Sequence, residues 1–203
     1  MSPVKSPEQT RQRILDSAFT EFYQHGFQGS SLNRIIATAE TTKGGLFHHF
    51  DGKQALGYAV IDEVILNLTR NKWILPISRS TNPIKEIKQI LQNGLTEMQG
   101  EGNLALCQGC PLNNLAQEMS SLDEGFRQRI EDIYYLWRNA IARSFQRAID
   151  AGTVRADANP ESIGAFIVAT LTGMIGTAKN TQNIEILKLA AEQLWHYLDT
   201  LRV

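Results

Sequence analysis

The residues best suited to binding chemistry lie in the segment TTKGGLFHHF, residues 41–50. Its hydroxyl and ammonium groups are ligands for phosphate, and its two glycines leave the backbone bare. Adjacent residues do not share a helix face, so His48 and His49 make a poor pair for a metal ion. We therefore predict no metal site, and we interpret the segment as a surface that faces phosphate, with one of the two histidines turned toward it.

A second group of reactive side chains is the pair Cys107 and Cys110, just before Pro111. If Pro111 begins a helix, Cys110 lies at its N-terminus, where the pKa of a thiol falls and the thiol becomes reactive. The alternative is two half-buried cysteines that behave as small hydrophobic residues. A zinc site needs more ligands, and a thioredoxin-like enzyme needs a βαβ context that the sequence lacks.

The composition is that of a globular protein that builds its own core. The chain has 203 residues, of which 42% are hydrophobic and 20% charged, with a formal net charge of −1. Global charge therefore gives no argument for nucleic acid or for an anionic membrane. The N-terminus lacks the apolar stretch of a signal peptide, and the most apolar segment, residues 162–178, falls short of the roughly 20 residues that span a bilayer. We expect a soluble cytoplasmic protein with no membrane partner.

Helical signals run through the chain and strand signals are nearly absent, which predicts an all-α fold. Four expected helix starts carry a capping residue, Ser6, Asp51, Asn82 and Asn159, and proline follows three of them. Apolar residues then recur at spacings of three and four. About nine helices are expected: residues 6–26, a short helix from 31, then 41–50, 51–73, 83–99, 111–121, 122–150, 160–178 and 183–201.

The helices fall into two blocks, residues 1–52 and 53–203, with no linker between them. The helix that begins near Asp51 is expected to join the blocks and couple them mechanically. In the first block, two short helices with a tight turn between them, over about residues 31–50, indicate a helix-turn-helix. The second helix of that motif enters the DNA major groove and needs small residues and phosphate-binding groups at its start, which residues 41–45 supply. Leu46 and Phe50 would anchor it.

The stretch GFQGSSLNRIIATAETTKGGLFHHFDGKQAL, residues 26–56, resembles the signature of TetR-family transcriptional repressors. The resemblance extends over about residues 8–60. It implies that the first block binds a palindromic, double-stranded DNA operator and that the second block binds a small-molecule effector and forms a homodimer. The expected DNA-binding residues are Arg34, Thr41, Thr42, Lys43, Gly44, Gly45, Phe47, His48 and Lys53.

Three residues depart from the family pattern. Glu40 takes the place of a glycine in the turn, where it must adopt the backbone conformation that the turn demands and where its charge is unfavourable next to phosphate. Phe47 replaces a tyrosine and lacks its hydroxyl. Gly45 replaces an alanine. These changes bear on DNA affinity and on sequence preference rather than on the fold.

The second block supplies candidates for both of its implied roles. The last two helices carry apolar side chains at helix-packing spacing, and the block is rich in aromatic residues and methionine. We expect a dimer interface at Ile163, Leu171, Leu187, Ala191, Leu194 and Leu198. Candidate residues for the ligand pocket are Trp73, Met98, Cys110, Tyr134, Trp137, Phe166 and Met174.

We therefore expect a ligand-responsive, DNA-binding regulator, a repressor that a small molecule releases from its operator, with no enzymatic activity and no cofactor. One alternative is a thiol-based sensor or enzyme that uses Cys107 and Cys110. Another is a helical interaction protein that has lost DNA binding. The departures at Glu40 and Phe47 are the features that favour this alternative. The sequence leaves open the effector, the operator, the regulated genes and the choice between repressor and activator.

Overall fold

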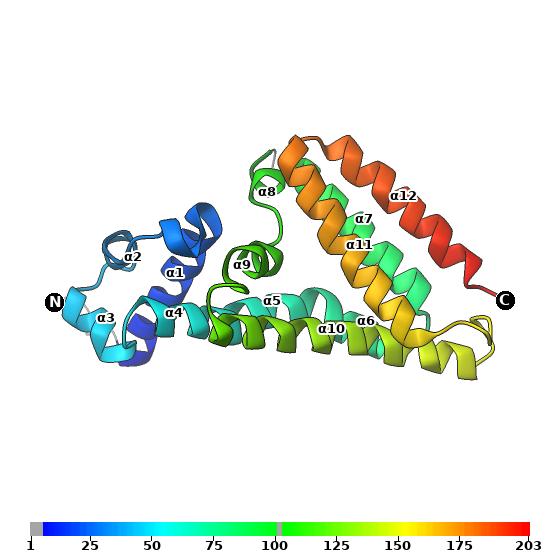
Figure 1. Cartoon of the computed structure of the whole chain (residues 1–203), viewed down its shortest axis with the longest axis horizontal. Helices are drawn as coiled ribbons and strands as arrows, with labels where there is room; N and C mark the ends of the chain where they lie inside the picture. Colours follow the sequence, from blue (N-terminus) through cyan, green and yellow to red (C-terminus); the bar gives the residue numbers. More distant parts are fainter. Residues whose placement is uncertain (1–5, 101–102) are drawn as a thin grey trace. The chain divides into compact units, whose positions relative to one another are not determined.

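The computed structural model describes residues 6–100 and 103–203 and confirms an all-α fold (Figure 1). Within the described residues, the only strand-like pairing is an isolated bridge between Val154 and Arg202. The chain forms two compact units. Unit 1 combines the chain up to Asn67 with Asn114–Ile130, and unit 2 combines Leu68–Asn113 with Glu131–Val203. The domain boundary that the sequence places between residues 52 and 53 stays a prediction.

The first helix of unit 1, α1 (Pro7–Gly29), begins as its sequence predicts. The Ser6 hydroxyl accepts from the Gln9 N–H, and the Gln9 side chain accepts from the Ser6 N–H, which completes a capping box. Gly26 breaks the helix with a φ of 73°, so the predicted stop is confirmed, although one further turn follows it. The buried side of α1 carries Ile14, Leu15, Ala18 and Phe22.

The helix-turn-helix consists of α2 (Leu32–Thr38) and α3 (Lys43–His49). Both helices pack on α1, and Ile35 and Leu46 are fully buried between the three. The turn is closed by backbone hydrogen bonds from the Glu40 N–H to the Ala37 carbonyl and from the Thr41 N–H to the Ile36 carbonyl. The long α1 and the two short helices therefore form a small bundle, in which α3 is buried on one side and exposed on the other.

The fourth predicted helix is longer than expected, because it continues from α4 (Lys53–Ala59) through η1 (Val60–Ile65), α5 (Leu66–Thr69) and η2 (Arg70–Ile74) to α6 (Leu75–Arg79). Its predicted cap was wrong: Gly52, with a φ of 113°, is the N-cap, and Asp51 does not cap the helix. In the η2 turn the Leu75 N–H bonds to the Arg70 carbonyl, five residues back. Such widened turns relieve the clash that a proline makes inside a helix, so Pro76 does not end this one.

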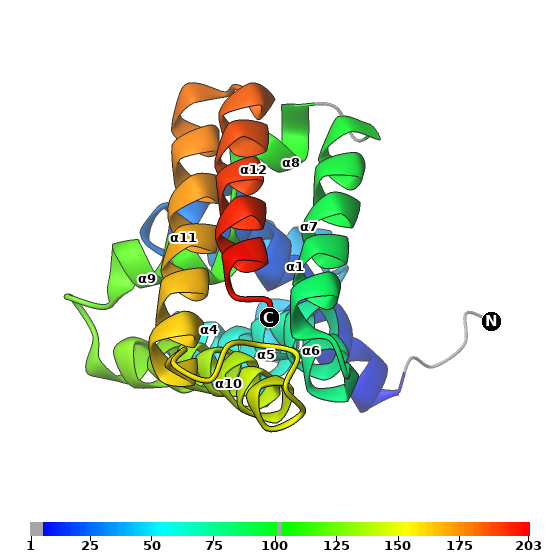
Figure 2. The same ribbon diagram turned by 90° about the vertical axis from the view of Figure 1, so that its right-hand side faces the viewer.

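Unit 2 contains α7 (Pro83–Gly100), α11 (Pro160–Thr181) and α12 (Ile184–Thr200), with α11 and α12 antiparallel and α12 beside α7 (Figure 2). Asn159 caps α11 as predicted, by accepting from the Ser162 N–H. Asn82 caps α7 in the same way, by accepting from the Lys85 N–H. Helix α8 (Asn103–Gln108) was not predicted. The predicted break at GEG falls on residues 100–102, of which 101 and 102 lie outside the described residues.

Helices α9 (Pro111–Met119) and α10 (Glu124–Asp150) each contribute residues to both units. In unit 2, the Ser144 hydroxyl on α10 donates to the Ile77 carbonyl, and Trp137 packs on Trp73 with ring centroids 5.1 Å apart. These contacts place α10 against the end of the long helix. Each of the nine predicted helices therefore has a counterpart among the described residues.

Helix α11 is long and apolar enough to cross a membrane by length and composition alone. Only 39% of its apolar window is buried within the chain. An apolar helix in the core or at an interface of a water-soluble protein passes the same test, so the finding is weak evidence for a membrane span.

Candidate nucleic-acid interface

The outward face of α3 carries most of the residues predicted to bind DNA. Thr42, Lys43, Gly44 and His48 are exposed, and Phe47 is 45% exposed although it is large and apolar. The Thr42 hydroxyl accepts from the Gly45 N–H at 3.0 Å and so caps the helix. The remaining N–H groups of the first turn have no partner within the helix and are available to an anion.

The two glycines of α3 differ in their surroundings. A Cβ added at Gly44 would meet only the Thr42 hydroxyl, at 3.9 Å, so this side is open. A Cβ added at Gly45 would lie 2.5 Å from the Thr41 hydroxyl. Gly45 therefore makes room for a threonine of its own motif, and clearance for DNA stays a prediction for the exposed Gly44.

The turn before α3 is strained at Glu40, which has a φ of 48°. This left-handed conformation is unfavourable for a residue with a Cβ, and glycine avoids the cost. The Glu40 carboxylate lies 3.7 Å from the Arg13 guanidinium, and its side chain is 75% exposed. An exposed negative charge therefore lies in the turn just before α3.

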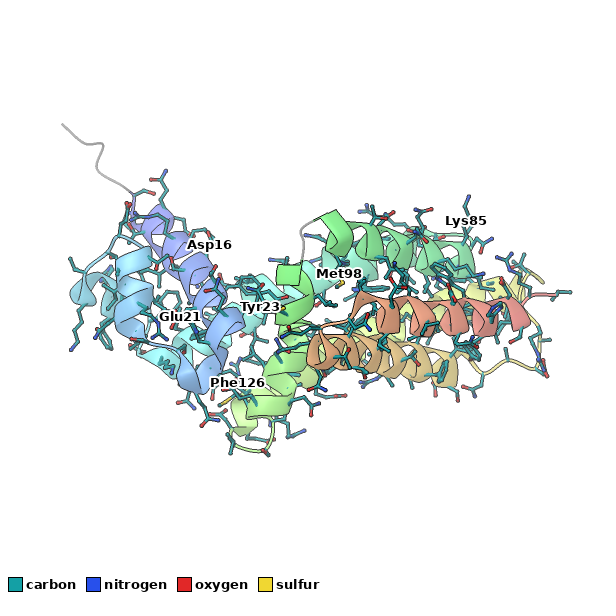
Figure 3. The ribbon with its side chains drawn as sticks, turned by 90° about the horizontal axis from the view of Figure 1, so that it is seen from above. Asp16, Glu21, Tyr23, Lys85, Met98 and Phe126 are labelled. Carbon is teal, nitrogen blue, oxygen red and sulfur yellow. The ribbon has the colours of Figure 1, made fainter. Side chains whose placement is uncertain are left out.

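Arg34 is held by its own unit. Its Nε donates to Glu21, which also accepts from the Ser31 N–H at 2.9 Å (Glu21 is labelled in Figure 3). Burial raises the pKa of Glu21, but the hydrogen bonds from Arg34 and Ser31 lower it, and the net pKa lies below its ordinary value. The pair stays ionised and fixes α2 against α1. The Arg34 side chain remains half exposed, so it can still meet a phosphate from this fixed position.

Lys53 also makes internal contacts. Its ammonium group donates to the Gln28 carbonyl at 3.2 Å and to the Ser30 carbonyl at 2.8 Å, and it lies over the Phe27 ring. Burial lowers the pKa of Lys53. Two of its three donors are thus occupied by the chain, which sets it apart from the exposed Lys43.

The two histidines of α3 lie beside each other. The His48 and His49 rings lie 5.0 Å apart in an edge-to-face arrangement, with His48 exposed and His49 half-buried. Among the described residues, no group of three His, Cys, Asp or Glu side chains could hold a metal ion.

In unit 2, several of the predicted pocket residues lie close together. Trp137 is buried against Trp73, and its indole N–H has no hydrogen-bond partner among the described residues. One turn away on α10, the Tyr134 hydroxyl lies 3.3 Å from the Asn113 side chain. Burial raises the pKa of both the Tyr134 hydroxyl and the Cys110 thiol, so both groups are neutral near pH 7.

The thiol of Cys110 does not have the character of a reactive thiolate. Burial raises its pKa, and the N–H groups of Asn113 and Leu112, together with the charge of Lys72, only partly offset that effect. A thiol with a raised pKa is a weaker nucleophile at neutral pH because less thiolate is present. The described contacts therefore do not favour the thiol-based alternative.

The fold places the six residues expected at the dimer interface inside the chain. All six are buried within the chain itself. The apolar row on α12, Leu187, Ala191, Leu194 and Leu198, packs on α11 and α7. Phe166, expected in the pocket, is 46% exposed and packs on Tyr197 with ring centroids 4.6 Å apart. Sequence spacing identified the apolar faces of these helices but did not distinguish the face packed inside the chain from the outer one.

The bundle of α1, α2 and α3, with its exposed recognition helix, defines a helix-turn-helix DNA-binding protein. Residues 14–60 match the N-terminal profile of bacterial regulatory proteins of the tetR family, and residues 83–194 match the tetracyclin repressor-like C-terminal domain. The chain belongs to the TetR family of transcriptional regulators.

Individual relatives agree with this family over nearly the whole chain. The transcriptional repressor DhaR of Mycobacterium sp. (strain GP1) is 26% identical over 177 residues, which cover 87% of this chain and 86% of DhaR. A TetR-family regulator from Cytophaga hutchinsonii has the same fold, with a TM-score of 0.84, 21% identity and coverage of 97% and 96% of the two chains. The reduced form of Escherichia coli NemR aligns with a TM-score of 0.82, 22% identity and coverage of 96% and 97%.

Proposed function

We propose that the protein is a homodimeric repressor that leaves its operator when a small molecule binds unit 2. One observation carries the DNA-binding part: α3 buries Leu46 and turns Thr42, Lys43, Gly44 and His48 outward. Hydroxyl, ammonium and free N–H groups on one helix end match the phosphate and base-edge contacts of a recognition helix. Thr41, Gly45, Phe47, Arg34 and Lys53 complete the proposed DNA surface, with Lys53 acting mainly through the backbone that it supports.

The DNA-binding proposal is tested on a duplex that the wild-type protein selects from a randomised pool. Lys43→Ala is expected to weaken binding and to lower the salt dependence of the affinity by about two units of log–log slope, because the dimer loses one phosphate contact in each half-site. Lys85→Ala is the matched control, because Lys85 is an exposed lysine on α7 in unit 2 (Figure 3). Equal affinities for the wild type and Lys43→Ala would contradict the assignment of α3.

We propose that the dimer forms through the outer faces of α11 and α12. Phe166 and Leu189 are 46% and 59% exposed, and most of the apolar window of α11 is uncovered within the chain. Small exposed residues, Ala165, Ala169 and Gly173, accompany Phe166 on the same face of α11 and would let a second helix approach closely. Two-fold symmetry also matches a palindromic operator.

The dimer face is tested by placing a charge in it. Phe166→Glu is expected to shift the protein from dimer to monomer in analytical ultracentrifugation, because an unpaired carboxylate is costly in an apolar interface. Tyr135→Glu is the control, since Tyr135 is an exposed aromatic residue on α10 outside the proposed face. A Phe166→Glu variant that sediments as a dimer would rule out this face.

We propose that the effector binds near Trp73 and Trp137. A buried indole N–H without an acceptor is unfavourable, and a ligand with an acceptor group would satisfy it. Compounds that release the operator are therefore expected to change tryptophan emission. Trp137→Phe keeps an aromatic side chain, although a smaller one, and removes the N–H, so the variant should bind operator normally and respond weakly to such compounds. A normal response would place the effector elsewhere.

The proposal includes a cytoplasmic location, where the operator DNA of a bacterial regulator lies, and no catalytic turnover. Family membership supports both points, since the relatives are named as transcriptional regulators.

A further inference from the structure

The turn that connects α1 to α2 is held by side chains from several helices. Because Gly26 leaves the helical conformation, the N–H groups of Phe27 and Gln28 have no carbonyl four residues back to bond to. The Glu118 carboxylate accepts from both of them, at 2.8 Å in each case. A Cβ at Gly26 would lie 3.0 Å from a Glu118 oxygen, so both the positive φ and this close approach favour glycine.

The other side chains that form hydrogen bonds with the turn come from the first 67 residues. Lys53 donates to the Gln28 and Ser30 carbonyls, and Arg34 donates to the Gly29 carbonyl. Glu118 differs from these partners because it lies on α9, about 90 residues further along the chain. Its neighbourhood in unit 1 is tightly packed, since Phe27 meets Phe126 with ring centroids 4.6 Å apart (Phe126 is labelled in Figure 3).

Helix α9 has different partners at its two ends. Its first residues, up to Asn113, belong to unit 2, where the N–H groups of Leu112 and Asn113 bond to the Cys110 sulfur and the Asn113 side chain meets Tyr134. Its last turns belong to unit 1, where Glu118 holds the α1–α2 turn. Helix α9 thus carries contacts within unit 2 at its start and, within unit 1, the contact of Glu118 with the α1–α2 turn.

We propose that Glu118 is a positioning residue for DNA binding: α9 fixes the helix-turn-helix through the hydrogen bonds of Glu118 to Phe27 and Gln28. Displacement of α9 would remove the carboxylate from the turn and free α2 and α3 to leave the geometry that fits DNA. The inference rests on the proposed function, because it concerns the same operator binding and its release. Hydrogen bonds to an ionised carboxylate are stronger than those between neutral groups, and Glu118 makes two of them with the α1–α2 turn.

The test compares Glu118→Ala, Glu118→Gln and wild type on the selected operator duplex, with Gln117→Ala as control because Gln117 is an exposed neighbour on α9. Glu118→Ala is expected to lose about fivefold or more in operator affinity, the lower end of typical coupling between sites. Glu118→Gln keeps one acceptor oxygen and should fall between Glu118→Ala and wild type. Affinity for unrelated DNA should stay unchanged in all variants.

A purely structural role makes a different prediction. It lowers the melting temperature but leaves operator affinity unchanged at temperatures where circular dichroism shows the variant folded. Hydrogen exchange at the Phe27 and Gln28 amides gives a direct readout, and faster exchange in Glu118→Ala without any change in operator affinity would overturn the inference. If Glu118→Ala does not fold, the same comparison is made with Glu118→Gln. A wild-type protein that selects no duplex would instead refute the proposed function.

Discussion

Replacement of Glu40 by glycine is expected to stabilise the protein and to strengthen its binding to the operator. Glu40 is one of two described non-glycine residues with positive φ, and the other, Gln182, has the same φ of 48°. Glu40 also carries a negative charge next to the recognition helix. The two effects, backbone strain and charge, act on different measurements and are therefore separable.

The stability gain follows from three opposing contributions. A left-handed residue with a Cβ costs about 1–2 kcal/mol. Glycine offsets about 0.5–1 kcal/mol of this gain, because a chain with glycine loses more conformational entropy on folding. The ion pair with Arg13 spans 3.7 Å and Glu40 is 75% exposed, so its loss costs little. A net gain of about 0.5 kcal/mol remains, which raises the Tm by about 1–2 °C for a chain of this length.

The gain in affinity comes from the charge. A unit charge about 10 Å from a phosphate contributes about 0.4 kcal/mol in water, or roughly a twofold change in Kd per operator half-site at low salt. Glu40→Gln removes the charge and keeps the strain, so it should strengthen DNA binding without raising the Tm. Gln182→Gly relieves comparable strain far from α3 in sequence and should raise the Tm without changing DNA binding.

Fluorescence anisotropy at two salt concentrations and thermal unfolding give both measurements on the same samples. An operator affinity that is unchanged in both Glu40→Gly and Glu40→Gln would refute the placement of this carboxylate near DNA. A Tm that falls in Glu40→Gly would show that the contacts of Glu40 outweigh its backbone strain.

Two further predictions concern packing and pH. Gly164→Ala should destabilise the protein by about 1–3 kcal/mol in chemical denaturation, because its Cβ would lie 2.6 Å from the Arg138 carbonyl. Gly94→Ala, where the nearest atom is 3.8 Å away, should gain about 1 kcal/mol, and equal effects at the two sites would contradict the packing argument. Hydrogen bonds from Arg127 and Gln128 lower the pKa of Glu124 to about 2. The contribution of Glu124 to stability is therefore present above its ordinary pKa of 4.5 and is lost as pH falls toward 2. Glu124→Gln should lose less stability than the wild type over that pH range. Parallel profiles of stability against pH for the two proteins would disprove the effect.

Local signals in the sequence were sufficient for most of the helices and for the helix-turn-helix motif, although α8 was missed. Capping residues such as Ser6, Asn82 and Asn159 act on backbone groups within three or four residues, so their effect is readable without knowledge of the fold. The order of residues 41–50 likewise determines which side of α3 is apolar. The strain at Glu40 was also predictable, because the family pattern places glycine there.

Contacts between distant segments could not be read in the same way. The apolar row on α12 has the same residue spacing whether it packs within its own chain or against a second copy. Only the fold shows that it is buried within the chain. Pro76 lies within a continuous helix because π turns precede it. The spacing of the chain gave no hint that Glu118 would hold the N–H groups of Phe27 and Gln28. Helix capping and the hydrogen bonds inside a helix act over a few residues, whereas burial depends on which surfaces the folded chain brings together. The sequence alone therefore determined most of the helices and the helix-turn-helix, and the tertiary structure decided what each face contacts.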